Sequence, residues 1–288
     1  MLVYIRRVTF LGMQNQAYHP QGITISYDQA KAEHILIIDV RAEREYVAGH
    51  IPDAISLPLT KILQVAGDDY KLSKTFGSFG IGHDTQCVFY DDAFGAVASR
   101  VAMALESVGG RASLLDVTYT IWRRDHTPNM GEPRRLDPIT FLMADRSSLD
   151  TMLTDIKDVK AVTESNDSSN DILLDARERL NFLSGHIPGA INMPYTMFKD
   201  AENDKILRTP DDLSRIFKNR GLDPNRPIRI ITYCGSSGTL SGLVYYALRQ
   251  AGFASISMYA NSFREWNSQE GRAVEVQEDA NYWDLSAE

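Results

Sequence analysis

Cysteine is scarce in this chain, because its 288 residues contain only Cys87 and Cys234. Two cysteines cannot build a framework of several disulfides, and no Cys/His spacing resembles a zinc site. We therefore expect no metal centre. A reducing compartment is the simplest interpretation, meaning the cytoplasm or, in a eukaryote, the mitochondrion.

Long apolar runs and an excess of basic charge are also missing. No apolar run reaches the ~18 residues that indicate a membrane span. The chain has 30 Lys and Arg against 38 Asp and Glu, a net charge of -8. Nucleic-acid-binding proteins usually carry basic surfaces, so we expect neither a nucleic-acid nor a membrane partner. With 43% hydrophobic and 24% charged residues, the composition is typical of a globular protein.

Acidic residues are absent from residues 1–27, which contain Arg6 and Arg7. That pattern is faintly like a transit peptide, although it lacks the long apolar stretch and cleavage site of a secretory signal. The segment from Leu2 to Leu11 is rich in Val, Ile, Tyr and Phe, and a first strand is the favoured interpretation.

An internal repeat organises the rest of the chain. Residues 39–58 read DVRAEREYVAGHIPDAISLP and residues 175–194 read DARERLNFLSGHIPGAINMP, with nine of twenty positions identical. Further on, CVFYDD corresponds to IITYCG, which aligns Asp91 with Cys234, and a later aromatic block aligns Trp122 with Trp266. Three matching blocks in the same order indicate two homologous domains.

The domain limits follow from the repeat and from a proline-rich segment between its copies. We predict a first domain over 1–125, a linker over 126–146 and a second domain over 147–288. The linker contains three prolines and has no clean periodicity.

Each copy alternates short apolar runs with helical stretches. Strands are predicted over 34–40, 87–91 and 113–116 in the first copy, and over 171–176, 228–234 and 255–259 in the second. A helix is predicted over 96–109 and its counterpart over 240–252. Continuous Ile, Leu and Val runs favour strands buried on both faces of a parallel sheet. The fold class is therefore α/β, in two tandem domains whose sheets are flanked by helices.

Cys234 ends a predicted buried strand and precedes Gly-Ser-Ser-Gly-Thr and a helix. Such a loop can point several backbone N–H groups toward one spot, and the helix dipole adds partial positive charge there. Both effects stabilise a thiolate, the reactive form of cysteine. Cys87 starts an apolar strand with no such loop, so we interpret it as buried and inert.

These motifs resemble the rhodanese family of sulfurtransferases. The resemblance rests on D-x-R…GHIP-x-A-I in both copies, on the strand–cysteine–loop–helix, and on the aromatic block that ends in Glu-Trp. It implies that Cys234 alone takes sulfur from a donor as a persulfide and passes it to an acceptor, without metal or organic cofactor. An aspartate such as Asp91 often replaces the cysteine in the first copy of two-domain members.

The loop sequence bears on the donor. Thiosulfate-using members resemble Cys-Arg-Lys-Gly-Val-Thr, and mercaptopyruvate-using members resemble Cys-Gly-Ser-Gly-Val-Thr. The neutral Gly235 and Ser236 favour 3-mercaptopyruvate, whereas Ser237 and Gly238 depart from its pattern. Thiosulfate remains the alternative donor. The acceptor is expected to be a thiol, such as thioredoxin or glutathione, or cyanide.

Further site residues follow from the resemblance. Arg177 is expected to bind the donor carboxylate, or else to hold the fold as Arg41 would in the other copy. The second arginine common in the family is replaced by Asn181. The donor is also expected to contact the loop residues Gly235, Ser236, Ser237, Gly238 and Thr239.

Ser236 and His50 are candidates for moving protons. His50 has a counterpart in His186, which favours a role in holding the fold. Thr239 is predicted to cap the following helix or to bind the donor.

Two other functions remain open. A cysteine phosphatase or arsenate reductase would need an arginine six residues after the cysteine, where this chain has Leu240. A persulfide carrier without turnover would need the same activated thiol.

Overall fold

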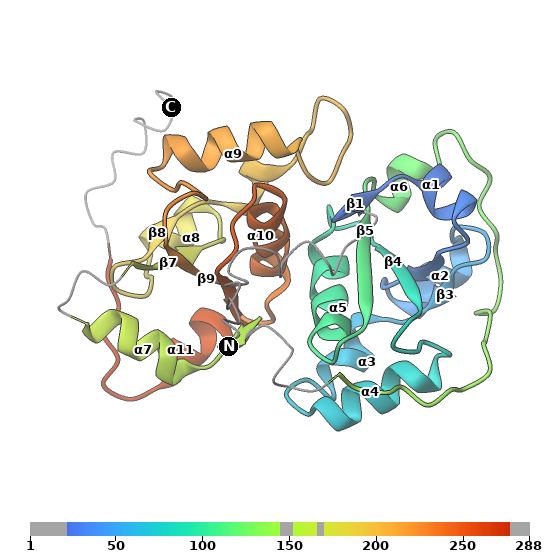
Figure 1. Cartoon of the computed structure of the whole chain (residues 1–288), viewed down its shortest axis with the longest axis horizontal. Coiled ribbons are helices and arrows are strands. Elements are labelled where there is room, and N and C mark those ends of the chain that lie inside the picture. The colour runs from blue at the N-terminus through green and yellow to red at the C-terminus, as the bar shows by residue number, and fades with distance from the viewer. Residues whose placement is uncertain (1–21, 145–151, 166–169, 277–288) are drawn as a thin grey trace, which may run out of the picture.

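The computed structural model describes residues 22–144, 152–165 and 170–276, so the strand predicted over 2–11 lies outside the described residues. Two lobes stand side by side, and each is a sheet with helices packed against it (Figure 1). The first lobe is formed by the first copy of the repeat and the second lobe by the second copy.

The elements of the first domain, in chain order, are β1 Thr24–Ile25, α1 Tyr27–Ala32, β2 Leu36–Asp39, α2 Glu43–Ala48, β3 Ile55–Ser56, α3 Leu59–Leu63, α4 Asp69–Ser78, β4 Gln86–Tyr90, α5 Ala96–Glu106, β5 Arg111–Leu115 and α6 Tyr119–Trp122. The elements of the second domain are β6 Leu153–Thr154, α7 Ile156–Glu164, β7 Asp171–Asp175, α8 Arg179–Leu183, β8 Ile191–Asn192, the 3-10 helix η2 Tyr195–Phe198, α9 Pro210–Asn219, β9 Arg229–Tyr233, α10 Thr239–Gln250, β10 Ile256–Tyr259 and α11 Ser262–Ser268.

Both sheets have the same topology. The strand order is β1-β5-β4-β2-β3 in the first domain and β6-β10-β9-β7-β8 in the second. Every pair of neighbouring strands is parallel. The central strands are almost wholly buried because helices cover both faces, which explains their continuous apolar sequences. The predicted α/β fold in two tandem domains is confirmed.

The chain between α6 and the second sheet runs along the first domain. Residues 123–144 contain no regular helix or strand. Asn129 exchanges backbone hydrogen bonds with His50, and the Ile139 N–H donates to the Gly77 carbonyl at 2.9 Å. These contacts attach the connecting segment to the first domain.

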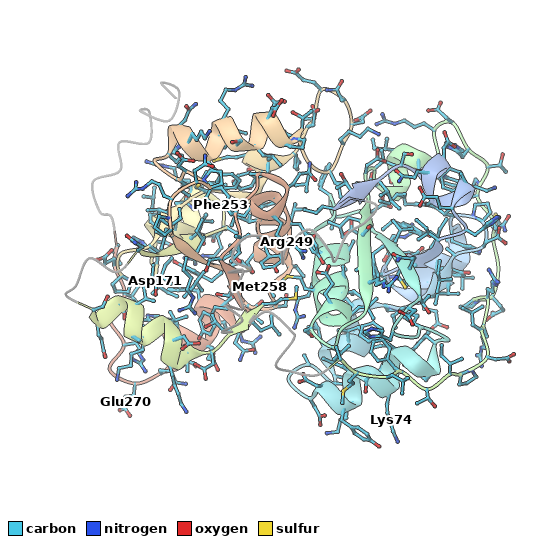
Figure 2. All side chains as sticks on the ribbon, in the orientation of Figure 1. Lys74, Asp171, Arg249, Phe253, Met258 and Glu270 are labelled. Atoms are coloured by element: carbon cyan, nitrogen blue, oxygen red, sulfur yellow. The ribbon has the colours of Figure 1, made fainter. Side chains whose placement is uncertain are left out.

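The two domains meet along α5 and α10, which lie against each other in the centre of the molecule (Figure 1). A Cβ on Gly242 of α10 would lie 3.4 Å from the Ser99 Cβ of α5, so the helices approach closely. The Tyr246 hydroxyl donates to the Glu106 carboxylate at 2.7 Å. Arg249, labelled in Figure 2, contacts the same carboxylate at 3.2 Å. One apolar core therefore continues from one domain into the other.

Candidate active site

Cys234 lies between β9 and α10, at the carboxyl edge of the second sheet. We call residues 234–239 the Cys234 loop. Gly238 occupies the N-cap of α10 with φ of 74°, a left-handed conformation that glycine adopts without strain. The loop therefore turns sharply into the helix, and Cys234 is only 2% exposed beneath it.

Ser262, the first residue of α11, lies against Cys234. The Cys234 N–H donates to the Ser262 hydroxyl oxygen at 3.1 Å, and Ser262 Oγ is 3.6 Å from Cys234 Sγ. The same hydroxyl lies 3.0 Å from the Tyr259 carbonyl. The Phe263 N–H donates to the Cys234 carbonyl at 3.0 Å. The start of α11 thus fixes the backbone of the cysteine and places a hydroxyl beside its sulfur. Ser262 was not among the site residues predicted from the sequence.

The equivalent loop of the first domain, residues 91–96, begins at Asp91 and shows what the backbone can bind. The Asp91 carboxylate accepts hydrogen bonds at 2.8 Å from the N–H groups of Ala93, Gly95, Val97 and Ala98. Burial raises the pKa of the Asp91 carboxyl, and the four N–H donors act in the opposite direction. This Asp91 loop is an anion-binding cradle occupied by its own side chain.

The two loops correspond residue by residue. Each has a left-handed glycine at the N-cap of its helix, Gly95 with φ of 82° and Gly238 with φ of 74°. The four donors of the Asp91 loop correspond to the N–H groups of Ser236, Gly238, Leu240 and Ser241. An anionic sulfur that extends from Cys234 would meet the same arrangement of donors, and a helix N-terminus favours that charge.

Arg177 has a structural role. Its Nε and Nη2 donate to the Asp175 carboxylate at 3.0 and 2.6 Å, and Nη2 also donates to the Gly185 carbonyl. Its guanidinium lies over the Phe263 ring, 4.2 Å from the centroid. Arg41 makes the matching contacts with Asp39 in the first domain. Both arginines therefore hold the fold.

The remaining nitrogen of each arginine has a different neighbour. In the first domain, Arg41 Nη1 lies 3.5 Å from the Asp92 carboxylate. Gly235 takes the place of Asp92 in the second domain, and no atom lies within 4 Å of a Cβ built on it. The space that a carboxylate fills beside Arg41 is thus open beside Arg177.

A cavity of about 600 Å³, which we call the entrance cavity, opens beside Gly235 of the Cys234 loop. Its wall includes Arg177, Gly235 and Asn181, and also Tyr195 and Arg264. Arg264 is exposed, and its backbone N–H donates to the Gly235 carbonyl at 2.9 Å. Arg264 therefore adds a cation to the wall where the family's second arginine is replaced by Asn181. Arg264 was not among the site residues predicted from the sequence.

The other predicted loop residues have different surroundings. Ser236 is exposed, while the Ser237 carbonyl accepts a hydrogen bond from Arg100 Nε of the first domain at 3.0 Å. The prediction that Thr239 caps the helix is wrong. Gly238 is the N-cap and Thr239 already belongs to the first turn, because the left-handed glycine ends the loop one residue earlier.

His50 has the surroundings of a residue that holds the fold. Its ring stacks on Tyr46 at 3.7 Å, and its Nδ1 lies 2.9 Å from the Tyr46 carbonyl. His186 repeats both contacts with Phe182 in the second domain. These neighbours favour the structural interpretation, and a catalytic role for His50 stays a prediction.

Cys87 is buried in β4, and its Sγ lies 3.6 Å from the Thr85 carbonyl. Burial raises the pKa of the Cys87 thiol, so the thiol stays protonated at neutral pH. This environment suits an inert cysteine.

No group of three or more His, Cys, Asp or Glu in the described ranges could hold a metal ion. Among the same residues, no helix is both long enough and apolar enough to cross a membrane.

The parallel-sheet domain occurs twice. One copy has a buried cysteine at a helix N-terminus, and the other copy has an aspartate at the same place. The chain is therefore a tandem α/β protein with a single cysteine-loop site. The family model for the rhodanese-like domain matches residues 26–125 and 157–269. The chain therefore belongs to the rhodanese-like domain family, which confirms the resemblance drawn from the sequence.

Several relatives match across both domains. The chain is 27% identical over 248 residues to the thiosulfate sulfurtransferase of Cricetulus griseus, a match that covers 78% of this chain and 80% of the relative. It is also 27% identical over 246 residues to the 3-mercaptopyruvate sulfurtransferase of Mus musculus, covering 78% and 79%. The crystal structure of SseA from Escherichia coli, described among 3-mercaptopyruvate sulfotransferases, matches with a TM-score of 0.71 at 25% identity, covering 84% of this chain and 99% of SseA.

Proposed function

We propose that this protein is a sulfurtransferase that takes a sulfur atom from 3-mercaptopyruvate onto Cys234 and passes it to a thiol or to cyanide. One observation carries the proposal. The Asp91 side chain accepts hydrogen bonds from four N–H groups of its loop, and the Cys234 loop has the same spacing to a left-handed N-cap glycine with a cysteine in place of the aspartate.

The first half-reaction forms the persulfide. The Cys234 thiolate attacks the sulfur of the donor, and the bond between that sulfur and the donor's carbon breaks. The electron pair leaves on the carbon skeleton as an enolate, which takes up the proton that the donor thiol releases. The products are pyruvate and a Cys234 persulfide. The N–H groups of the loop stabilise its negative charge.

The donor's carboxylate is proposed to occupy the space beside Gly235. Arg177 Nη1 would contact it as Arg41 Nη1 contacts Asp92, and Arg264 would lie on the opposite wall. Planar recognition of a carboxylate suits arginine. The neutral side chains of the loop favour this donor over thiosulfate, which lacks a carboxylate.

The second half-reaction returns the enzyme to its starting state. A thiol of thioredoxin or glutathione, or cyanide, attacks the outer sulfur, and the sulfur–sulfur bond breaks to regenerate the Cys234 thiolate. A thiol acceptor leaves as a persulfide and cyanide leaves as thiocyanate. No metal or organic cofactor takes part in either step.

Intact-mass analysis after incubation with 3-mercaptopyruvate alone tests the proposal. The chain should gain about 32 Da, one persulfide sulfur, and peptide mapping should locate it on Cys234. The Cys87→Ser variant should gain the same mass, and the Cys234→Ser variant should gain none. Sulfur found on Cys87 would overturn the assignment.

Steady-state rates decide between the related activities. We expect turnover with 3-mercaptopyruvate and a small thiol to exceed turnover with thiosulfate. A strong preference for thiosulfate would overturn the choice of donor but not the sulfurtransfer. A chain that loads one sulfur and then stops without a protein partner would be a carrier.

A further inference from the structure

Arg100 reaches the Cys234 loop from the other domain. It lies on α5, is 4% exposed, and its Nε donates to the Ser237 carbonyl at 3.0 Å. Its Cδ and Nε would each lie 3.3 Å from a Cβ built on Gly238. The guanidinium therefore packs directly on the turn that carries the reactive cysteine.

The charge of Arg100 has no carboxylate partner among the described residues. Arg249, in the same interface, shows the contrast, because its guanidinium pairs with Glu106 at 3.2 Å. Burial lowers the pKa of Arg100, and negative charge on Cys234 acts in the opposite direction. An arginine remains protonated even when it is buried. The loop lies between this cation and the sulfur of Cys234, whose negative charge acts on Arg100 across it.

The hydrogen bond to Ser237 also orients the loop. The Ser237 carbonyl and the Gly238 N–H belong to one trans peptide plane, so they point in opposite directions. When Arg100 holds the carbonyl on its own side, the Gly238 N–H points the other way. Gly238 corresponds to Gly95, whose N–H donates to the Asp91 carboxylate at 2.8 Å.

The other loop provides an internal comparison. Arg100 on α5 corresponds in the repeat to Leu243 on α10. The Leu243 Cδ1 would lie 3.4 Å from a Cβ on Gly95, just as Arg100 packs on Gly238. The loop that carries aspartate is thus backed by an apolar side chain, and the loop that carries cysteine is backed by a cation.

We propose that Arg100 is a positioning residue through which the first domain completes the active site of the second. It stabilises the anionic sulfur of Cys234 as thiolate and as persulfide, and it aims the Gly238 N–H at that sulfur. This inference rests on the proposed function for its purpose. Its physical content, a cation that stabilises the thiolate, can be measured without any sulfur donor.

The other charged groups near the entrance come from different elements. Arg177 is paired with Asp175, while Glu178 and the exposed Arg264 line the entrance cavity. None of these groups is substituted in the variants that test Arg100. A shift in the pH profile of Cys234 alkylation therefore reports on Arg100.

The test is the pH dependence of alkylation by iodoacetamide in a Cys87→Ser background, where Cys234 is the single thiol. The variants are Arg100→Leu, which copies the first domain's counterpart, Arg100→Gln, which removes the charge but keeps a donor for Ser237, and Arg100→Lys. Arg111→Leu is the control for net charge, because it removes a cation of the first domain at an exposed position away from the loop.

We expect Arg100→Leu and Arg100→Gln to raise the midpoint of the alkylation profile by about 1 to 2 pH units, which slows alkylation at pH 7 about tenfold or more. Arg100→Lys should keep the midpoint close to that of the parent chain, because lysine retains the charge. It should still lower the kcat of sulfur transfer, because lysine lacks the planar geometry of arginine. Arg111→Leu should leave the midpoint in place.

An unchanged midpoint in Arg100→Gln would overturn the proposal, even if Arg100→Leu fails to fold. An equal shift in Arg111→Leu would do the same. A chain that forms no persulfide but still shows the Arg100-dependent midpoint would refute the proposed function and leave the electrostatic role of Arg100 standing.

Discussion

At the scale of single residues, the arginines around Cys234 differ in how their charge is used. The guanidinium of Arg177 is bonded to Asp175 and Gly185 on two of its nitrogens. Arg264 is exposed on the wall of the same cavity. The first is part of the scaffold and is proposed to offer its remaining nitrogen to the donor, whereas the guanidinium of the second faces solvent.

Replacing Arg264 by alanine should raise the KM for 3-mercaptopyruvate by about tenfold, because one charge-assisted hydrogen bond to the carboxylate is lost. The kcat should change little, since Arg264 is proposed to contact the carboxylate and not the sulfur. Steady-state kinetics at fixed acceptor measure both. Arg226→Ala, an exposed arginine before β9, is the control. A fall in kcat without a change in KM would contradict this role.

His50→Asn tests the two interpretations of that histidine. The substitution removes a ring stacked on Tyr46, so we expect the unfolding free energy to fall by about 1 to 3 kcal/mol. His186→Asn should lose at least as much, because His186 makes the matching stack and also contacts the Glu275 carboxylate at 3.2 Å. The kcat per folded molecule should stay close to that of the parent chain. A loss of kcat in His50→Asn alone, with the fold retained, would support proton transfer by His50 instead.

At the scale of elements, the strand–loop–helix unit shows how one backbone serves two chemistries. The Asp91 loop encloses its own carboxylate. The Cys234 loop has the same left-handed glycine at the helix N-cap, and its N–H groups are proposed to bind the persulfide of Cys234. Left-handed glycine is required in both because it ends the cradle and starts the helix.

Substituting these glycines by alanine separates the cost to the fold from the effect on chemistry. Each change places a Cβ in a left-handed conformation and should cost about 1 to 2 kcal/mol. Crowding adds to this cost. A Cβ on Gly95 would lie 2.8 Å from the Ile206 side chain, and a Cβ on Gly238 would lie 3.1 Å from the Met258 side chain. Only Gly238→Ala should also lower the rate of persulfide formation, by about tenfold or more. Denaturant unfolding and single-turnover loading measure the two effects.

The sequence predicts the elements that are buried on both faces, but not the shorter ones. The apolar runs identified β2, β4, β7 and β9 within about two residues, whereas β1, β3, β6 and β8 have two residues each and carry no periodic signal. The loop of Cys234 could be predicted because all its donors are local. Ser262 lies 28 residues away, and Arg100 reaches Ser237 across 137 residues. Such contacts depend on how the chain and its domains pack.

At the scale of the whole molecule, the two domains are joined by a buried polar contact within an apolar interface. The Tyr246 hydroxyl of α10 donates to the Glu106 carboxylate of α5, and Arg249 balances the charge of that carboxylate. Because Arg100 lies on the same helix as Glu106, the interface that stabilises the molecule also places Arg100 against the Cys234 loop.

Tyr246→Phe should therefore weaken the molecule in a way that depends on pH. At pH 8 the variant should lose about 1.5 to 3 kcal/mol of unfolding free energy, the usual contribution of a hydrogen bond to a charged group. Burial, with the nearby Glu106 carboxylate, raises the pKa of Tyr246 well above its ordinary value. The folded chain thus keeps this proton above pH 10, whereas the unfolded chain releases it.

An acid whose pKa is raised by folding contributes stability below its unfolded pKa and loses that contribution as the pH rises above it. The difference in unfolding free energy between the parent chain and Tyr246→Phe should consequently shrink above about pH 10, by roughly 1.4 kcal/mol per pH unit. Urea unfolding from pH 8 to pH 11 measures this difference. Tyr70→Phe is the control, because the Tyr70 side chain is exposed and its difference from the parent should stay flat. A difference for Tyr246→Phe that is equally flat would show that the hydroxyl ionises alike in the folded and unfolded chains, and the buried contact with Glu106 would then not hold the two domains together.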